Sequence, residues 1–305
     1  MRKMNMLLFL ILFLAGCSQG LSADDPAIPP NPTTGAGQEQ EDAYLLLKQA
    51  DLISKEGNRW LVTAYEKSGD GNPHIAAYMI TVNDQTILEK GSGGAAASHD
   101  FKIGSQVEVW YTGAIAESYP AQTTAAKVIL ADDENGRSEA VQAALKEWTE
   151  PSMAWAVKDA AFDADAGVWN VEMVKYETIE EPTMVKVDAA TGMVIVAEND
   201  VFRVFSPKPE SEAGPTFTVS GEARVFEAAF SWTLEDGHDI LAEGHEMADA
   251  GAPEWGRFEF EVNYDKATQE NMMLILYVHS AKDGSMENEL VIPLKAPEAH
   301  IERIQ

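Results

Sequence analysis

Short runs in which apolar and polar residues alternate recur along most of this chain, and they constrain its fold more than any other feature. In the clearest run every second residue is large and apolar: Phe258, Phe260, Val262 and Tyr264. The residues between them are polar, and because a strand places alternate side chains on opposite faces, the run predicts a half-buried strand. Many such runs separated by turns predict a mainly β, multidomain protein, which a length of 305 residues permits.

The region 214–295 holds six of these runs, which predict an antiparallel β-sandwich. The expected strands are 216–221, 225–234, 239–247, 256–264, 272–280 and 289–294. Residues 272–278 are apolar at every position, which is typical of a strand inside a sheet. The chain has one cysteine, at position 17, so this sandwich is expected to be stable without a disulfide.

Several blocks in this region carry a family resemblance. In chain order they are Val219–Ala223, Glu243-Gly244, Gly251–Phe258, Ser280–Ser285 and Val291–Leu294. The third block reads Gly-Ala-Pro-x-Trp-Gly-x-Phe and is the most distinctive. The region resembles the immunoglobulin-like domain of bacterial spore germination. That resemblance implies an extracytoplasmic binding or scaffolding module of Gram-positive, often spore-forming, bacteria, and it implies no catalytic residues.

Residues 43–131 form a second β-rich module, with strands expected at 50–54, 60–65, 75–82, 107–111 and 127–130. The segments Phe101–Trp110 and Gly113–Gln122 resemble the YobA-like domain of unknown function, in which the fold looks like a small OB-like β-barrel. Ser118 follows Glu117 and invites comparison with a nucleophile, but no Gly-x-Ser-x-Gly elbow is present. We interpret this segment as structural, with Tyr119 packing and Pro120 ending a strand.

The middle module, residues 137–205, is predicted to combine one helix with a β-meander. Ser138 is expected to cap the helix, and Pro151 to end it. Its apolar side chains follow a helical period: Val141, Ala144, Leu145 and Trp148. Strands are expected at 155–161, 168–176, 184–187 and 193–198, with a hairpin turn at 188–192. The hairpin resembles that of a PepSY-type domain; a generic α+β module is the alternative.

The N-terminus predicts a lipoprotein. Residues 1–16 combine a basic start with an apolar run that is about half as long as a bilayer core is thick, as in a signal peptide. The run ends in residues that resemble a bacterial lipobox: Leu14, Ala15, Gly16 and Cys17. That resemblance implies cleavage before Cys17 and acylation of its thiol. Residues 17–42 are rich in Pro, Gly, Ser and acids, which predicts a flexible tether.

The formal net charge of −28 becomes −30 once Arg2 and Lys3 leave with the signal peptide. Such acidity argues against nucleic acid as a partner, because phosphate backbones are bound through clustered Lys and Arg. It argues equally against adhesion to anionic headgroups or wall polymers. The charge is instead expected to keep a tethered protein soluble and extended.

We expect neither catalytic residues nor a metal or cofactor site. His238 and His245 stand among several acids, but their odd separation places them on opposite faces of a regular strand. Weak calcium binding by the acidic residues stays open. Trp255 is expected to pack over the end of the sandwich, with an exposed ligand platform as the alternative.

These observations predict a non-enzymatic, lipid-anchored protein on the outer face of the cytoplasmic membrane. It would bind or scaffold a protein or cell-wall partner, with a link to sporulation or germination as the role that the resemblance implies. One alternative, based on the PepSY-like hairpin, is a regulator or inhibitor of a secreted peptidase. A carbohydrate or cell-wall hydrolase is a third and weaker hypothesis.

Overall fold

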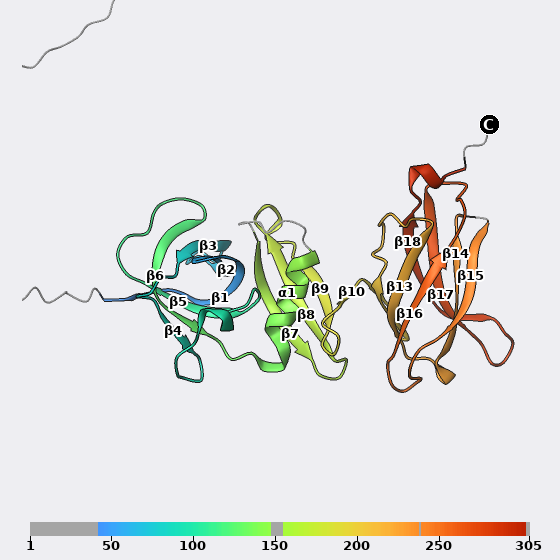
Figure 1. Cartoon of the computed structure of the whole chain (residues 1–305), viewed down its shortest axis with the longest axis horizontal. Helices are drawn as coiled ribbons and strands as arrows, with labels where there is room; N and C mark the ends of the chain where they lie inside the picture. Colours follow the sequence, from blue (N-terminus) through green and yellow to red (C-terminus); the bar gives the residue numbers. More distant parts are fainter. Residues whose placement is uncertain (1–41, 148–154, 238, 303–305) are drawn as a thin grey trace, which may run out of the picture. The chain divides into compact units, whose positions relative to one another are not determined.

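A computed structural model describes residues 42–147, 155–237 and 239–302. These residues form eighteen strands and one α-helix, and the strands group into four sheets (Figure 1). The prediction of a mainly β, multidomain fold is confirmed. Five short 3₁₀ turns complete the regular structure, at Ser98–Asp100, Glu134–Gly136, Tyr176–Thr178, Phe226–Ala228 and Glu298–His300.

The N-terminal module is a closed ring of strands. Its members are β1 (Tyr44–Glu56), β2 (Arg59–Lys67), β3 (Pro73–Thr81), β4 (Ile87–Lys90), β5 (Gln106–Tyr111) and β6 (Ala121–Leu130). The order is β3-β2-β1-β5-β6, and β3 also pairs in parallel with β6, which closes five strands into an OB-like barrel as predicted. Trp60 and Phe101 fill its core, with ring centroids 5.1 Å apart. Strand β4 was not predicted from the sequence, because it is short and has no alternating pattern.

The middle module packs one helix on a meander. Helix α1 (Arg137–Glu147) lies against β7 (Trp155–Asp163), β8 (Val168–Lys175), β9 (Thr183–Asp188) and β10 (Val194–Ile195), in the order β10-β9-β8-β7. Val141 and Ala144 of the helix are fully buried against Val171 and Met173 of the sheet. This arrangement confirms the predicted α+β module. Trp148 and Pro151 lie outside the described residues.

The predicted capping role of Ser138 is wrong. Helix α1 begins at Arg137, so Ser138 lies in its first turn, where the side chain of Asp133 takes the capping position. The Ser138 backbone N–H donates to Asp133 Oδ1 at 2.9 Å, and its hydroxyl donates to the other carboxylate oxygen. A left-handed turn at Asn135 and Gly136 brings Asp133 over the helix end, which a pattern of helical spacing cannot reveal.

The C-terminal module is an immunoglobulin-like sandwich of two antiparallel sheets, which confirms the predicted fold (Figure 1). One sheet has the order β11-β12-β13-β16, with β11 (Ala197–Glu198), β12 (Phe202–Ser206), β13 (Thr216–Ala223) and β16 (Gly256–Asn263). The other has the order β15-β14-β17-β18, with β14 (Ala229–Glu235), β15 (Ile240–Met247), β17 (Asn271–His279) and β18 (Met286–Lys295). Aromatic side chains from both sheets meet in the core, where the Phe230 ring lies 4.8 Å from that of Phe258.

The sandwich begins earlier in the chain than the predicted boundary at 214. Strand β12 lies in the range 137–205 that was assigned to the middle module, yet it pairs with β13 of the sandwich. Phe202 and Val204 are fully buried in the sandwich core, and this burial explains why β12 belongs to the sandwich. The strand predicted at 193–198 is divided, since β10 pairs with β9 of the middle module and β11 pairs with β12.

The barrel and the middle module share a small interface. Arg137 Nη1 lies 2.7 Å from the buried carboxylate of Asp51 in β1. Gly104 of the barrel comes so close to α1 that an added Cβ would lie 2.3 Å from the carbonyl oxygen of Ser138. Four buried apolar residues of the two modules form a shared cluster: Ile75, Ala77, Ala156 and Val174. The close approach at Gly104 therefore requires glycine.

Candidate binding face of the sandwich

The predicted lipidation site lies outside the described residues, which begin at 42. Cys17 and the lipobox residues Leu14, Ala15 and Gly16, with the signal peptide 1–16 and the tether to residue 41, therefore stay predictions. No helix within the described part of the chain is long and apolar enough to cross a bilayer.

The segment around Ser118 makes local contacts, and the predicted role of Pro120 is wrong. Ser118 Oγ donates to the carbonyl oxygen of Pro120 at 2.7 Å and closes a local turn. Tyr119 is half exposed, and its ring centroid lies 6.2 Å from that of Tyr176. Pro120 directly precedes β6, so it introduces a strand and does not end one.

The histidines do not assemble a metal site in the described ranges, where no group of three or more His, Cys, Asp or Glu side chains is placed to hold an ion. His245 Nδ1 instead lies 2.8 Å from Ser231 Oγ on the neighbouring strand. Ser231 is 3% exposed, and the contact joins the side chains of two paired strands, β14 and β15. His238 lies outside the described residues, so the placement of His238 and His245 on opposite faces of a strand stays a prediction.

The outer face of the sheet β11-β12-β13-β16 is polar. On β16 the apolar residues Phe258, Phe260 and Val262 point into the core, and the residues between them are exposed: Arg257, Glu259, Glu261 and Asn263. Their partners on β13 are also polar, since Glu222 opposes Arg257 and Ser220 opposes Glu259. This is the alternation expected of a sheet with one solvated face.

The outer face of the sheet β15-β14-β17-β18 breaks that rule. Because Phe230, Trp232 and Leu234 of β14 enter the core, Ser231, Thr233 and Glu235 point outward. Their partners across the sheet form three rows: Ile240, Glu235, Met273 and Pro293; Glu243, Thr233, Ile275 and Val291; and His245, Ser231 and Tyr277. Met247 and Met286 lie at the ends of the outer strands.

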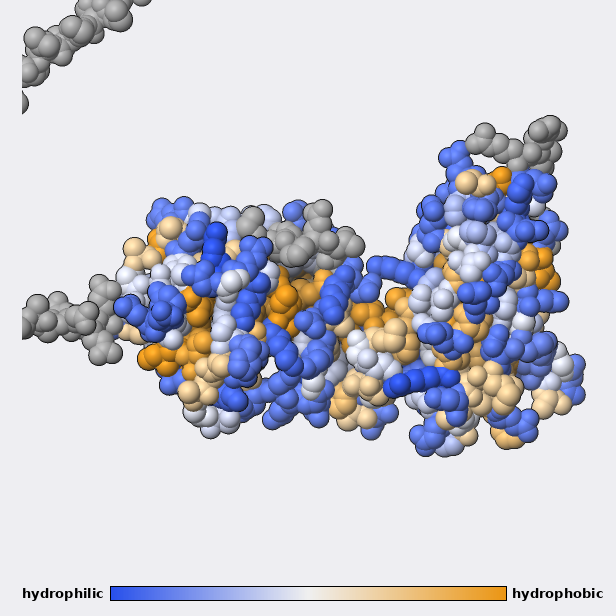
Figure 2. Space-filling model, viewed as in Figure 1, coloured by the Kyte–Doolittle hydropathy of each residue, from blue (hydrophilic) through white to orange (hydrophobic). Residues whose placement is uncertain are grey.

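We call this surface the apolar face and define its apolar members as Ile240, Met247, Met273, Ile275, Met286, Val291 and Pro293; Tyr277 lies on the same side of the sheet but is buried. Ile240, Met247, Met286 and Val291 are 56%, 71%, 51% and 45% exposed. Figure 2 shows apolar residues gathered at the edge of the sandwich along which β15 runs. Large exposed apolar groups that adjoin one another across a sheet mark a site of interaction, whereas isolated ones do not.

Acidic groups accompany the apolar side chains on this face. Burial raises the pKa of the Tyr277 hydroxyl, and the nearby carboxylates of Glu243 and Glu235 raise it further. Thr233 Oγ1 donates to Glu235 Oε1 at 2.9 Å, so that carboxylate is held on the surface of the sheet. The apolar face therefore combines apolar contact area with negative charge.

An open groove of about 1120 Å³ continues the apolar face at one end. Its lining includes Phe226, His245, Met247, His279 and Glu287. Phe226 is 82% exposed, because it starts a tight turn in which Glu227 and Ala228 have φ values of +58° and +60°. A non-glycine residue in that region costs roughly 1–2 kcal/mol, so a packed structure must hold the turn. Gly251 supplies that support, since a Cβ there would lie 2.9 Å from the Ala228 nitrogen.

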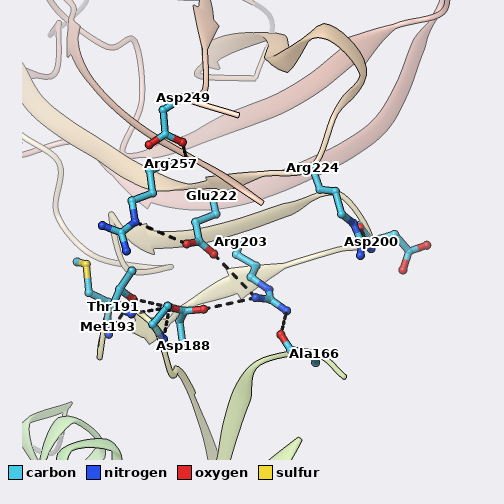
Figure 3. Close-up of polar contacts among 11 residues, drawn as sticks. Ala166, Asp188, Thr191, Met193, Asp200, Arg203, Glu222, Arg224, Asp249 and Arg257 are labelled. Atoms are coloured by element: carbon cyan, nitrogen blue, oxygen red, sulfur yellow. Dashed lines mark hydrogen bonds and ion pairs between the residues drawn. The ribbon is translucent and has the colours of Figure 1, made fainter. Parts of the chain in front are cut away.

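A charged row on the polar sheet joins the sandwich to the middle module (Figure 3). Arg203 of β12 is buried, and its Nη2 donates to the carbonyl oxygen of Ala166 at 2.8 Å. Its Nη1 lies 3.5 Å from Asp188 Oδ2 and 3.8 Å from Glu222 Oε2. Ala166 lies in a turn of the middle module and Asp188 is the last residue of β9, so one guanidinium connects the two modules.

The neighbours of Arg203 complete this row. Burial raises the pKa of Glu222, and the carboxylate of Asp188 raises it further, while Arg203 and Arg257 act in the opposite direction. The guanidinium carbons of Arg203 and Arg224 lie 4.2 and 4.8 Å from the centroid of the Trp255 ring. Trp255 is thus half-buried and packs against two guanidinium groups.

Sequence reasoning missed both the apolar face and Arg203. The alternation along single strands does not identify which residues become neighbours across a sheet, and Arg203 is an isolated cation between apolar residues in the sequence. That placement, Arg between Phe202 and Val204 in a strand, is the one signal that could have indicated a buried charge.

The comparisons with known proteins agree with two of the modules. Residues 201–285 match the family described as immunoglobulin-like domain of bacterial spore germination, and residues 51–130 match a family described as a protein of unknown function (DUF3221). The first match begins at 201, in agreement with the position of β12. No curated protein matches the chain.

Two similar solved structures are the extracellular domain of the putative one component system BT4673 from B. thetaiotaomicron and the same domain described as that of a putative hybrid two component system. Each is 11% identical, with a TM-score of 0.18, and the match covers 86% of this chain but 31% of the other. The chain thus spans less than a third of the length of these structures.

The spore-germination domain indicates an extracellular or envelope protein related to spore germination. The chain carries an immunoglobulin-like domain of bacterial spore germination at residues 201–285 and a domain of an uncharacterised family at residues 51–130.

Proposed function

We propose that this protein is a non-enzymatic binding or scaffolding protein, held on the outer face of the cytoplasmic membrane by lipid on Cys17. The observation that carries the proposal is the contrast between the two outer faces of the sandwich. One face is polar, and the other exposes apolar side chains on three of its four strands, β15, β17 and β18. A stable soluble domain retains such a surface when a partner covers it.

The N-terminal sequence supports the anchor. A signal peptide that ends at a lipobox leaves Cys17 as the first residue, and two acyl chains give stable attachment without a transmembrane helix. The tether of residues 17–42 would behave as a chain with a root-mean-square length of roughly 25–30 Å. The modules would therefore work close to the membrane, within the envelope.

Two variants test the two halves of this proposal. Cys17→Ala is expected to move the protein from the detergent phase to the aqueous phase, and equal partitioning of both forms would contradict the anchor. A photo-crosslinking residue at Met273, on the apolar face, is expected to give protein adducts in intact cells. The same residue at Glu261, on the polar sheet, is the matched control, and adducts from Glu261 alone would contradict a binding role for the apolar face.

A further inference from the structure

We propose that the apolar face docks a basic, amphipathic surface of another protein, with apolar side chains against the methionines and Lys or Arg against the flanking carboxylates. This inference rests on the proposed binding function and adds the chemistry of the partner. It draws on the composition of the face, the charge of the domain and the shape of the adjoining groove.

The apolar side chains determine the first half of the partner's chemistry. Burying a large apolar side chain stabilises a complex by about 1.5–3 kcal/mol before the costs of association, so several on one face favour an apolar partner. Three of the exposed members are methionines, Met247, Met273 and Met286, whose unbranched side chains adapt to different shapes. The partner is therefore expected to present apolar groups.

The charges determine the second half. Residues 201–305 contain 20 Asp and Glu against 8 Lys and Arg. Glu235 and Glu243 stand on the apolar face itself, close enough to Tyr277 to raise the pKa of its hydroxyl. Three glutamates and one arginine line the groove at the end of this face: Glu227, Glu246, Glu287 and Arg224. A second copy of this domain or an anionic lipid surface would meet like charge, whereas a basic protein surface would be attracted.

The groove gives the partner an anchor point. Phe226 stands exposed on a turn against which Gly251 packs, and it lines the groove together with Met247 and Glu287. An apolar side chain of the partner can pack against Phe226 and Met247 while a neighbouring cation pairs with Glu287. Buried anchors of this kind usually supply most of the affinity of an interface.

The test uses the whole chain from Ser18 to Gln305 and a fluorescent synthetic peptide in which lysine and leucine alternate. The pair Met273→Ser and Val291→Ser is expected to weaken binding by about tenfold. The pair Glu235→Gln and Glu243→Gln is expected to weaken it several-fold at low salt and less at high salt, because salt screens exposed charges. The matched control, Glu259→Gln with Glu261→Gln on the polar sheet, should leave binding unchanged.

The inference would be overturned if a glutamate–leucine peptide bound equally well, or if the control pair weakened binding as much as the substitutions on the apolar face. It would also be overturned if the chain bound anionic vesicles through Met273 and Val291, or if it formed a dimer that the substitutions at these two positions dissociate. Unchanged thermal unfolding of each variant excludes misfolding, since all substituted positions are at the surface. If the peptide fails while crosslinks form at Met273, the partner's chemistry is wrong but the binding function stands.

Discussion

The two sheets of the C-terminal sandwich share one core but present opposite surfaces. The outer face of β11-β12-β13-β16 carries a charged row, Arg203, Glu222 and Arg257, and the turns of the middle module cover its Arg203 end. The outer face of β15-β14-β17-β18 carries adjoining apolar side chains, many of them exposed. The difference indicates two kinds of contact: a polar one that orders the chain's own modules and an apolar one available to another protein.

The largest expected effect concerns the core that both sheets share. The Phe230 ring lies within 4.8–6.2 Å of the rings of Phe202, Phe258 and Phe260. Phe230→Ala should destabilise the sandwich by about 3–5 kcal/mol, because it leaves a cavity between the sheets. Urea unfolding measures this loss. A change below about 1 kcal/mol would mean that the sheets do not depend on one core.

The next effect concerns the charged row. Arg203→Ala should cost about 3 kcal/mol, because it leaves the buried carboxylates of Asp188 and Glu222 without their cation. Arg257, which is largely exposed and 4.0 Å from Glu222, is the matched control, and Arg257→Ala should cost less than about 1 kcal/mol. Urea midpoints compare the two variants, and equal losses would show that burial of the charge is not what matters.

The same row predicts a pH dependence. Since burial raises the pKa of Glu222 above its ordinary value of 4.5, the folded protein binds this proton more tightly than the unfolded chain does. The stability that the proton contributes is full below pH 4.5 and is lost as the pH rises through the folded pKa. Glu222→Gln should therefore gain stability relative to the native protein between pH 4.5 and pH 7.

Urea midpoints at the two pH values measure that difference, with the exposed Glu259→Gln as the control. A relative loss of stability in Glu222→Gln as the pH rises would show that the row holds this carboxyl in its charged form.

The smallest effect on stability is expected on the apolar face. Met273→Ser with Val291→Ser should change the free energy of unfolding by less than about 1 kcal/mol, because both side chains are partly in solvent already. Thermal unfolding measures it. A loss as large as that of Phe230→Ala would identify these residues as part of the core and would remove the contrast between the sheets.

Much of the fold was predictable because single strands carry their own pattern. The alternation at 258–264 correctly predicts β16 and its polar face, and five of the six strands of the N-terminal module follow from similar runs. The cap of α1 and the start of the sandwich depend on Asp133 and Phe202, whose roles arise from the turn at 135–136 and from pairing with β13. Local patterns do not contain that information.

The candidate site was harder to predict for the same reason. Residues 272–278 are apolar at every position and predict a strand inside a sheet, which β17 is. The sequence cannot distinguish a second face covered by another layer from one that stays exposed. Only the rows across β15, β14, β17 and β18 reveal that Met273, Ile275 and Val291 adjoin one another on the outside.

Methionine oxidation in intact cells tests the central claim most directly, because the chain carries its own controls. Met247, Met273 and Met286 lie on the apolar face, while Met184 and Met193 are comparably exposed in the middle module. In the purified chain all five should oxidise. In the envelope the account predicts that the three on the apolar face are protected while Met184 and Met193 still oxidise. Equal oxidation of both groups in the envelope would contradict it.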